Sequence, residues 1–238
     1  MPGQELRYEA DGVTMVGSLH RPAKGGEAPG VLVFPEAFGL GDHAMEKAER
    51  LAQELGYVAL ACDLWGERRN IDSMKDLMAE LGPLSKDAGR VRDMTGKALA
   101  ALTAQEGVDA SRIAAIGFCF GGTMAFELAL SGADIKAAIG FHSGLEVPSP
   151  QDAGNIKGKV LALIGADDPG IPPAQRDTFA KIMAGANVDW QMTLYGGVVH
   201  GYTNKTAARL NMPQFARYDA AADRRSWEQM ADLLAEVF

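Results

Sequence analysis

One of the two cysteines in the chain stands in a sequence that favours reactivity. Cys119 lies in the segment 117–122, GFCFGG, between an apolar run that predicts a strand and a run that predicts a helix. Glycines on both sides permit a tight strand-to-helix turn, which points the sulfur away from the sheet. The positive end of the helix dipole then favours the thiolate over the thiol. We therefore predict that Cys119 is a nucleophile and that the N–H of Phe120 binds an oxyanion.

The other cysteine, Cys62, ends a predicted strand over 57–62 and has no flanking glycine. Cysteine is among the most often buried residues, so this position predicts a core side chain. With two cysteines in all, the chain has neither a disulfide framework nor a four-cysteine zinc site, although a single bridge could form.

A nucleophile of this kind needs a base, and the chain has four histidines. His200 follows the predicted strand 188–195 and is the one that fits the chain order nucleophile, acid, histidine found in α/β-hydrolases. His142 ends another predicted strand and could reach the same sheet edge, where we expect it to line a substrate pocket. His20 and His43 are predicted to be surface or capping residues.

The acid of such a triad should follow a strand and precede the histidine in sequence. Asp167 and Asp168 follow the predicted strand 160–165, and their position alone does not separate them. The acid would hold the imidazole in the correct tautomer. An Asp pair before proline is also a common turn sequence, which is the alternative interpretation.

A second oxyanion donor is expected in the loop after the strand 31–34, where the N–H of Ala37 is the candidate. Glu36 is unusual beside it, because a carboxylate opposes a developing negative charge. It is either a surface residue or a group that manages the proton of Cys119.

The remaining elements needed to position these groups can be predicted from periodicity. A hairpin turns at Asp11-Gly12, and short apolar strands then alternate with helices, which indicates an α/β fold with a mostly parallel central sheet and helices on both faces. The segment 65–85 fits least well and could cap the site. Helices are predicted over 44–55, 87–104, 121–130, 173–184 and 226–238; further strands are predicted over 113–117 and 135–141.

The composition of the chain limits the kinds of molecule that it is expected to bind. Lys and Arg number 23 and Asp and Glu 31, a net charge of −8, which disfavours nucleic acid and anionic membranes. No signal peptide or membrane-length apolar run is visible, so a cytoplasmic protein is expected. No shift in composition divides the chain, so residues 1–238 are predicted to form one domain, as a monomer or small homo-oligomer.

The chain as a whole resembles the dienelactone hydrolase family, the cysteine branch of the α/β-hydrolases. The resemblance runs from about residue 12 to 238 and includes PEAFGL at 35–40, LGYVAL at 55–60, the Cys119 turn, Asp168 with Pro172, and HGYTN at 200–204. It implies a triad of Cys119, Asp168 and His200, with Glu36 contacting the resting thiol. It also implies hydrolysis of small enol-lactones or esters with neither a metal nor an organic cofactor.

The sequence departs from that family at one informative position. An arginine that holds the substrate carboxylate is expected four residues after the histidine, but this chain has Asn204, which cannot make a bidentate charged contact. The identity of the substrate is therefore open. The same loop carries Tyr202, predicted to close over the ligand, so that Tyr202, Asn204 and His142 are the expected substrate-binding residues.

Two other classes of protein are weighed against a hydrolase. A catalytically retired binding domain would have the same fold but form no acyl-enzyme. A redox, stress-type or glutamine-amide-transferring protein also places cysteine on a glycine-flanked turn. Glutamine-amide-transferring proteins typically have a His-x-Glu unit, whereas the two residues after His200 are Gly201 and Tyr202. Stress-type proteins usually have a histidine next to the cysteine, where this chain has Phe120.

Overall fold

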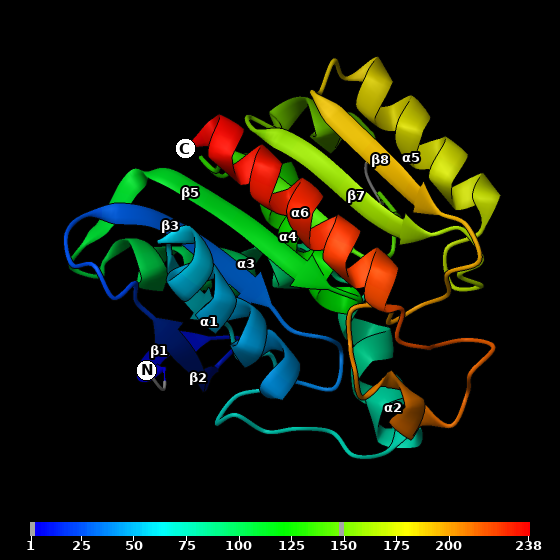
Figure 1. The fold of residues 1–238 in the computed structure, drawn as a ribbon, viewed down its shortest axis with the longest axis horizontal. Coiled ribbons are helices and arrows are strands. Elements are labelled where there is room, and N and C mark those ends of the chain that lie inside the picture. Colours follow the sequence, from blue (N-terminus) through cyan, green and yellow to red (C-terminus); the bar gives the residue numbers. More distant parts are fainter. Residues whose placement is uncertain (1–2, 148–149) are drawn as a thin grey trace.

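The computed structural model describes residues 3–147 and 150–238. Eight strands form one sheet in the order β1-β2-β4-β3-β5-β6-β7-β8 (Figure 1). The strands are β1 (Gln4–Ala10), β2 (Val13–His20), β3 (Ala28–Phe34), β4 (Val58–Ala61), β5 (Val108–Phe118), β6 (Ala137–Phe141), β7 (Lys159–Gly165) and β8 (Trp190–Tyr195).

The predicted hairpin and the mostly parallel sheet are both confirmed. β1 and β2 pair in an antiparallel register around Asp11 and Gly12, which both have positive φ. β2 pairs antiparallel with β4, and every pair from β4 to β8 is parallel. β3, β6 and β7 are apolar along nearly their whole length, and β5 is apolar from Ile113 onward, where both faces of the sheet are covered.

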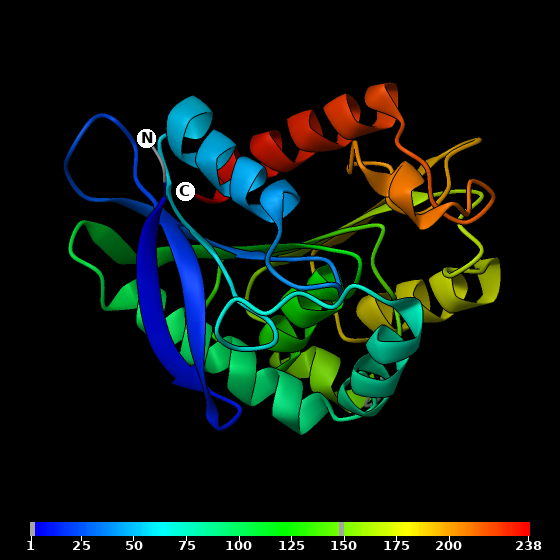
Figure 2. The ribbon, with the colours of Figure 1, turned by 90° about the horizontal axis from the view of Figure 1, so that it is seen from below.

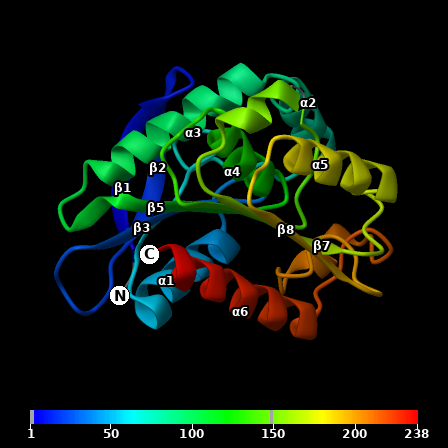
Figure 3. The same cartoon turned by 90° about the horizontal axis from the view of Figure 1, so that it is seen from above.

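Helices cover both faces of the sheet. α1 and α6 lie on one face, and α2 to α5 lie on the other (Figures 2 and 3). Each face has its own apolar core against the sheet. The helices are α1 (Asp42–Leu55), α2 (Met74–Leu84), α3 (Ala88–Thr103), α4 (Phe120–Leu130), α5 (Pro173–Gly185) and α6 (Ala220–Val237). None of them, within the described residues, has the length and apolar character required to cross a bilayer.

The C-terminal helix begins earlier than its apolar periodicity predicts. α6 starts at Ala220 rather than at residue 226, and the Asp219 side chain caps it by accepting hydrogen bonds from the N–H groups of Ala221 and Ala222 at 3.0 and 2.9 Å. Its first turn is polar because Asp223 forms a buried ion pair, 2.7 Å long, with Lys47 of α1. Apolar periodicity cannot identify a helical turn that contacts its neighbour through an ion pair rather than through apolar side chains.

The segment 65–85, which fits the sequence pattern least well, contains α2. The Ser73 hydroxyl caps this helix by accepting from the N–H of Asp76 at 3.1 Å. Ser85, directly after the helix, lines the main pocket described below. The segment therefore borders the site, as a cap would.

The register of the parallel strands brings the predicted site residues to one edge. Phe34 of β3 is level with Gly117 of β5, and Phe118 is level with Phe141 of β6. Phe141 is in turn level with Leu163 of β7. The loops that follow these strands therefore start side by side at the carboxyl edge of the sheet, where open α/β sheets bind ligands.

Candidate active site

The turn at Cys119 is strained, and glycines make it possible. Cys119 has φ 56° and ψ −122° and directly precedes α4, while its own N–H still donates to Phe141 O of β6 at 3.0 Å. A Cβ on Gly117 would lie 2.0 Å from the carbonyl oxygen of Gly121. A Cβ on Gly121 would lie 2.3 Å from the carbonyl oxygens of Phe34 and Pro35. The strand, the helix and the neighbouring β3 loop thus approach one another closely only because these positions lack side chains.

His200 and Asp168 meet as the acid and base of a triad would. The Nδ1 of His200 lies 2.7 Å from Oδ2 of Asp168, whose side chain is buried, and the other Asp168 oxygen accepts from the N–H of Gly170 at 2.8 Å. The His200 ring also stacks on Phe215, with 5.2 Å between ring centroids. These contacts fix the position and the tautomer of the imidazole. Of the two aspartates that sequence position left level, Asp168 is the partner of His200.

The electrostatics of His200 are set by the cysteine opposite it. Burial by itself lowers the pKa of the imidazole, but the negative Cys119 thiolate and the hydrogen bonds with Asp168 and Cys119 outweigh burial and raise the pKa to about 10. The charged imidazolium is therefore favoured at neutral pH when the sulfur is a thiolate. The charged imidazolium then forms an ion pair with the thiolate.

A Cys119→Ala variant should lower the pKa of His200. The substitution removes the negative neighbour that stabilises the imidazolium, whereas burial continues to favour the neutral ring. An NMR titration of ¹³C-labelled histidine checks this in the wild type and the variant. His20, whose pKa is lowered mainly by burial, serves as an internal control because Cys119 does not influence it. An unchanged His200 titration would contradict the ion pair.

Two backbone N–H groups are candidates for an oxyanion hole. Within the described part of the chain, neither the Phe120 N–H nor the Ala37 N–H donates to another group. The hydrogen bonds that hold the loop carrying Ala37 include Gly39 N to Glu36 O at 3.0 Å, Ile71 N to Phe38 O at 2.9 Å and Trp65 Nε1 to Ala37 O at 2.9 Å. Phe120 directly follows Cys119, and the start of the Ala37 loop approaches α4 closely at Gly121, so both N–H groups remain candidates.

Glu36 is held by the residue that departs from the family pattern. Asn204 donates from its amide nitrogen to Oε2 of Glu36 at 2.6 Å, and the Nδ1 of His43 lies 3.8 Å from the same oxygen. Burial raises the pKa of Glu36, while the hydrogen bond from Asn204 and the charges of His200 and Lys47 oppose that rise. Glu36 is therefore not the free surface residue that was one of its two interpretations.

Two of the three predicted substrate-binding side chains point into the protein. Tyr202 is 0% exposed and donates its hydroxyl to Leu163 O of β7 at 3.1 Å, so it anchors the loop and does not close over a ligand. His142 is also 0% exposed, and its Nε2 forms a hydrogen bond with the Thr203 hydroxyl at 2.9 Å. Its ring packs edge-on against the ring of His200, with 4.9 Å between the ring centroids. Sequence alternation does not show which loop side chains turn inward, and neither residue lines the pocket.

His20 and His43 are more buried than a surface or capping role predicts. His20 bonds through Nε2 to the Ser18 hydroxyl at 3.0 Å. His43 contacts the Thr203 carbonyl oxygen at 3.1 Å, and burial, followed by the charge of Lys47, lowers its pKa to about 3. A neutral His43 beside Glu36 is a neighbour of the site that the sequence did not reveal, because Thr203, which contacts it, lies 160 positions away in the chain.

Cys62 is confirmed as a core residue. Its side chain belongs to the apolar core on the α2–α5 face, and burial raises the pKa of its thiol. Both cysteines are free.

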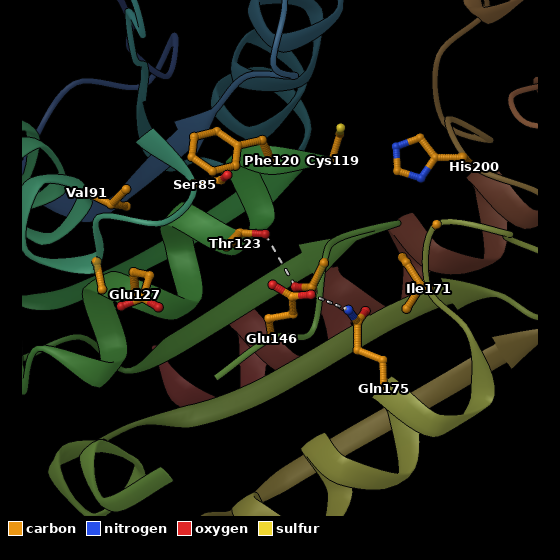
Figure 4. Close-up of a pocket in the computed structure, with 13 residues that line it drawn as sticks. Ser85, Val91, Cys119, Phe120, Thr123, Glu127, Glu146, Ile171, Gln175 and His200 are labelled. Atoms are coloured by element: carbon orange, nitrogen blue, oxygen red, sulfur yellow. Dashed lines mark hydrogen bonds between the residues drawn. The ribbon is translucent and has the colours of Figure 1, made fainter. Parts of the chain in front are cut away.

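A pocket of about 240 Å³ opens at Cys119 and His200 (Figure 4). It runs along the face of α4 that carries Phe120, Thr123 and Glu127, and it is closed on the opposite side by the loop after β7 and by Gln175 of α5. This volume is below the range of roughly 300–1,000 Å³ typical of sites for drug-sized ligands, which indicates a small substrate. The lining residues are Ser85, Ala88, Val91, Cys119, Phe120, Thr123, Glu127, Gly144, Glu146, Gly170, Ile171, Gln175 and His200.

Comparison with known proteins gives concordant matches. The model of the dienelactone hydrolase family matches residues 15–238. The solved structure named m3DLH is 46% identical, with a TM-score of 0.94 over 99% of this chain and 98% of the other. P91, described as a dienelactone hydrolase-like promiscuous phosphotriesterase from metagenomic libraries, is 40% identical, with a TM-score of 0.95 over the same shares.

A curated relative from Methylorubrum extorquens carries the name "Putative carboxymethylenebutenolidase". It is 30% identical over 76% of this chain, and the match spans 65% of the relative's own length. The structural neighbours share the α/β-hydrolase fold that the sequence predicts, and that expectation is confirmed.

Proposed function

Because the chain belongs to the dienelactone hydrolase family, a family of lactone and ester hydrolases, we propose that it cleaves small esters or lactones through a thioester on Cys119. The observation that carries this proposal is the arrangement of Asp168, His200 and Cys119 at the mouth of the pocket. The Nδ1 of His200 contacts the buried Asp168 carboxylate at 2.7 Å, and the imidazole also interacts with Cys119 at the strained turn. Such an orienting acid, base and nucleophile define covalent acyl transfer.

The first half of the reaction transfers the acyl group to the enzyme. The Cys119 thiolate attacks the acyl carbon, and the carbonyl oxygen takes the negative charge between the N–H groups of Phe120 and Ala37. The intermediate collapses, the bond to the leaving oxygen breaks, and the His200 imidazolium donates its proton to that oxygen. In a lactone the released alcohol or enol stays attached to the acyl chain.

The second half releases the acyl group and regenerates the thiolate. Neutral His200 takes a proton from water as the water oxygen attacks the thioester carbon. The carbon–sulfur bond then breaks, the carboxylic acid leaves, and the thiolate–imidazolium pair forms again. Asp168 stabilises the imidazolium at each step without itself accepting the proton.

Glu36 and Asn204 are assigned supporting parts in the same proposal. The resemblance to the family implies that Glu36 contacts the resting thiol, and here its carboxylate is bound by Asn204 at 2.6 Å. A neutral amide holds Glu36 without an ion pair, and burial raises the pKa of Glu36. Glu36 is thereby suited to share a proton with the cysteine, and Asn204 is its positioning residue rather than a contact of the substrate.

Trapping of the acyl-enzyme tests the proposal. We expect that rapid mixing with p-nitrophenyl acetate and quenching in acid adds one acetyl group, seen by intact mass spectrometry, and that peptide mapping assigns it to Cys119. The buried Cys62 provides an internal control, since its thiol should stay unmodified. Two results together would refute the mechanism: release of p-nitrophenol by the wild type with no acyl adduct on Cys119, and full turnover by the Cys119→Ala variant.

A further inference from the structure

Apart from the Cys119–His200 pair, the charged groups that line the pocket are both negative. Among its described lining residues, Glu127 and Glu146 are carboxylates and there is no lysine or arginine. The rest of the wall beyond the catalytic pair is largely apolar or uncharged, with Ala88, Val91 and Ile171 among its members. A cleft lined by charge of one sign repels a ligand of the same sign.

The arginines of the neighbouring segments are bound elsewhere. Arg92 lies between two carboxylates, with its Nε 2.8 Å from Glu127 and its Nη1 2.8 Å from Asp152. The charge of Arg92 is therefore already balanced by the carboxylates of Glu127, which lines the pocket, and Asp152, which does not. Its third guanidinium nitrogen, Nη2, is buried and has no hydrogen-bond partner among the described residues.

Three further arginines, Arg68, Arg69 and Arg90, are also engaged away from the pocket. Arg68 donates through Nε and Nη2 to the carbonyl oxygens of Val16 and Gly17 at 3.2 and 3.0 Å. Arg69 bonds to Glu80 at 2.7 Å, and Arg90 bonds to Asp11 of the hairpin turn at 2.7 Å. None of the three lines the pocket.

Asn204, at the position where the family has an arginine, faces Glu36 instead of the pocket. Its amide nitrogen donates to Glu36, and its oxygen accepts from the N–H and the hydroxyl of Thr206, both at 2.8 Å. Both ends of the amide are thus satisfied inside the protein. A carboxylate moved into this pocket would lose its water without gaining a lysine or arginine as a partner, which is unfavourable.

We propose that the acyl pocket takes an uncharged group and rejects an anionic one, so that the chain is selective for neutral esters or lactones. The inference rests on the proposed hydrolase function, and it adds the charge of the substrate. It follows from three observations together: two carboxylates in the wall, four arginines held in other contacts, and an amide that is directed away.

Two esters of the same length and leaving group test this selectivity. p-Nitrophenyl hexanoate has an apolar end, whereas mono-p-nitrophenyl adipate ends in a carboxylate. We expect kcat/KM for the hexanoate to exceed that for the adipate by at least about tenfold, after each is divided by its rate constant for hydroxide-catalysed hydrolysis. A ratio below tenfold would overturn the proposal.

A charge-reversed variant separates the pocket from the net charge of the protein. Glu146→Lys should raise kcat/KM for the adipate and narrow the ratio, because it places a cation in the wall. Asp232→Lys makes the same change in net charge on α6, which covers the opposite face of the sheet, and should leave the ratio as in the wild type. Equal effects of the two variants would also overturn the proposal. If neither ester is cleaved in a Cys119-dependent manner, the hydrolase function itself fails, which is a different outcome.

Discussion

Replacement of Cys119 with alanine is expected to lower kcat for p-nitrophenyl esters by about 10⁴- to 10⁶-fold. Without the sulfur no thioester can form, and His200 loses the group that it would activate. Only transition-state contacts such as the Phe120 and Ala37 N–H groups remain to accelerate direct attack by water. Steady-state assays under saturating ester, with active-site titration of the wild type, measure this loss.

A matched variant distinguishes loss of the nucleophile from damage to the fold. Cys62→Ala removes the same atoms from a thiol that is 1% exposed and belongs to the apolar core. It should lower the free energy of unfolding, since it leaves a small void, while kcat stays near the wild-type value. Near-normal turnover by Cys119→Ala would show that another group carries the chemistry.

Substitution of Gly121 by alanine should lower the free energy of unfolding by about 3 kcal/mol or more, measured by urea denaturation. The new Cβ would lie 2.3 Å from the carbonyl oxygens of both Phe34 and Pro35. These are backbone atoms of another element, so no rotamer change relieves the clash and α4 must move away from β3. The same movement displaces Ala37 from Cys119, so kcat should fall in whatever protein remains folded.

The helix glycine Gly96 provides the control for that substitution. Gly96 lies inside α3, and no atom lies within 4 Å of the Cβ that alanine would add. Alanine there reduces the conformational freedom of the unfolded chain and should raise the free energy of unfolding by about 0.4–1 kcal/mol. Similar destabilisation by Gly121→Ala and Gly96→Ala would mean that close approach at the turn is not the cause.

Much of the frame could be predicted from the sequence because its signals are local. Apolar runs without alternation predicted strands covered on both faces, and the structure has them within a few residues. The turn at Cys119 could be found because glycines stand on both sides of it in sequence. Gly117 is required by a close contact within the turn, whereas Gly121 is required by the close approach of the β3 loop. The order of Cys119, Asp168 and His200 along the chain predicted that they lie close together, because the parallel strands that precede them have their carboxyl ends at one edge of the sheet.

The contacts that could not be predicted join distant parts of the chain through polar groups. Glu36 and Asn204 are 168 positions apart, and no periodicity connects them. The direction of Tyr202 depends on a carbonyl oxygen of β7, and the early start of α6 depends on a lysine of α1. In each of these cases a polar partner elsewhere in the chain determines whether the side chain is buried. A single sequence does not show which residue that partner is.

The anchoring of Tyr202 has a consequence for how this enzyme could change during evolution. In the loop 200–204, His200 faces Asp168 and the pocket, Tyr202 is fixed in the interior, and Asn204 reaches Glu36. The buried tyrosine lies between the residue that contacts Asp168 and the residue that departs from the arginine implied by the family resemblance. A new side chain at position 204 would change what holds Glu36, while the Tyr202 anchor keeps the loop beside it in place. Substitution at position 204 therefore does not by itself require the contact between His200 and Asp168 to be rebuilt.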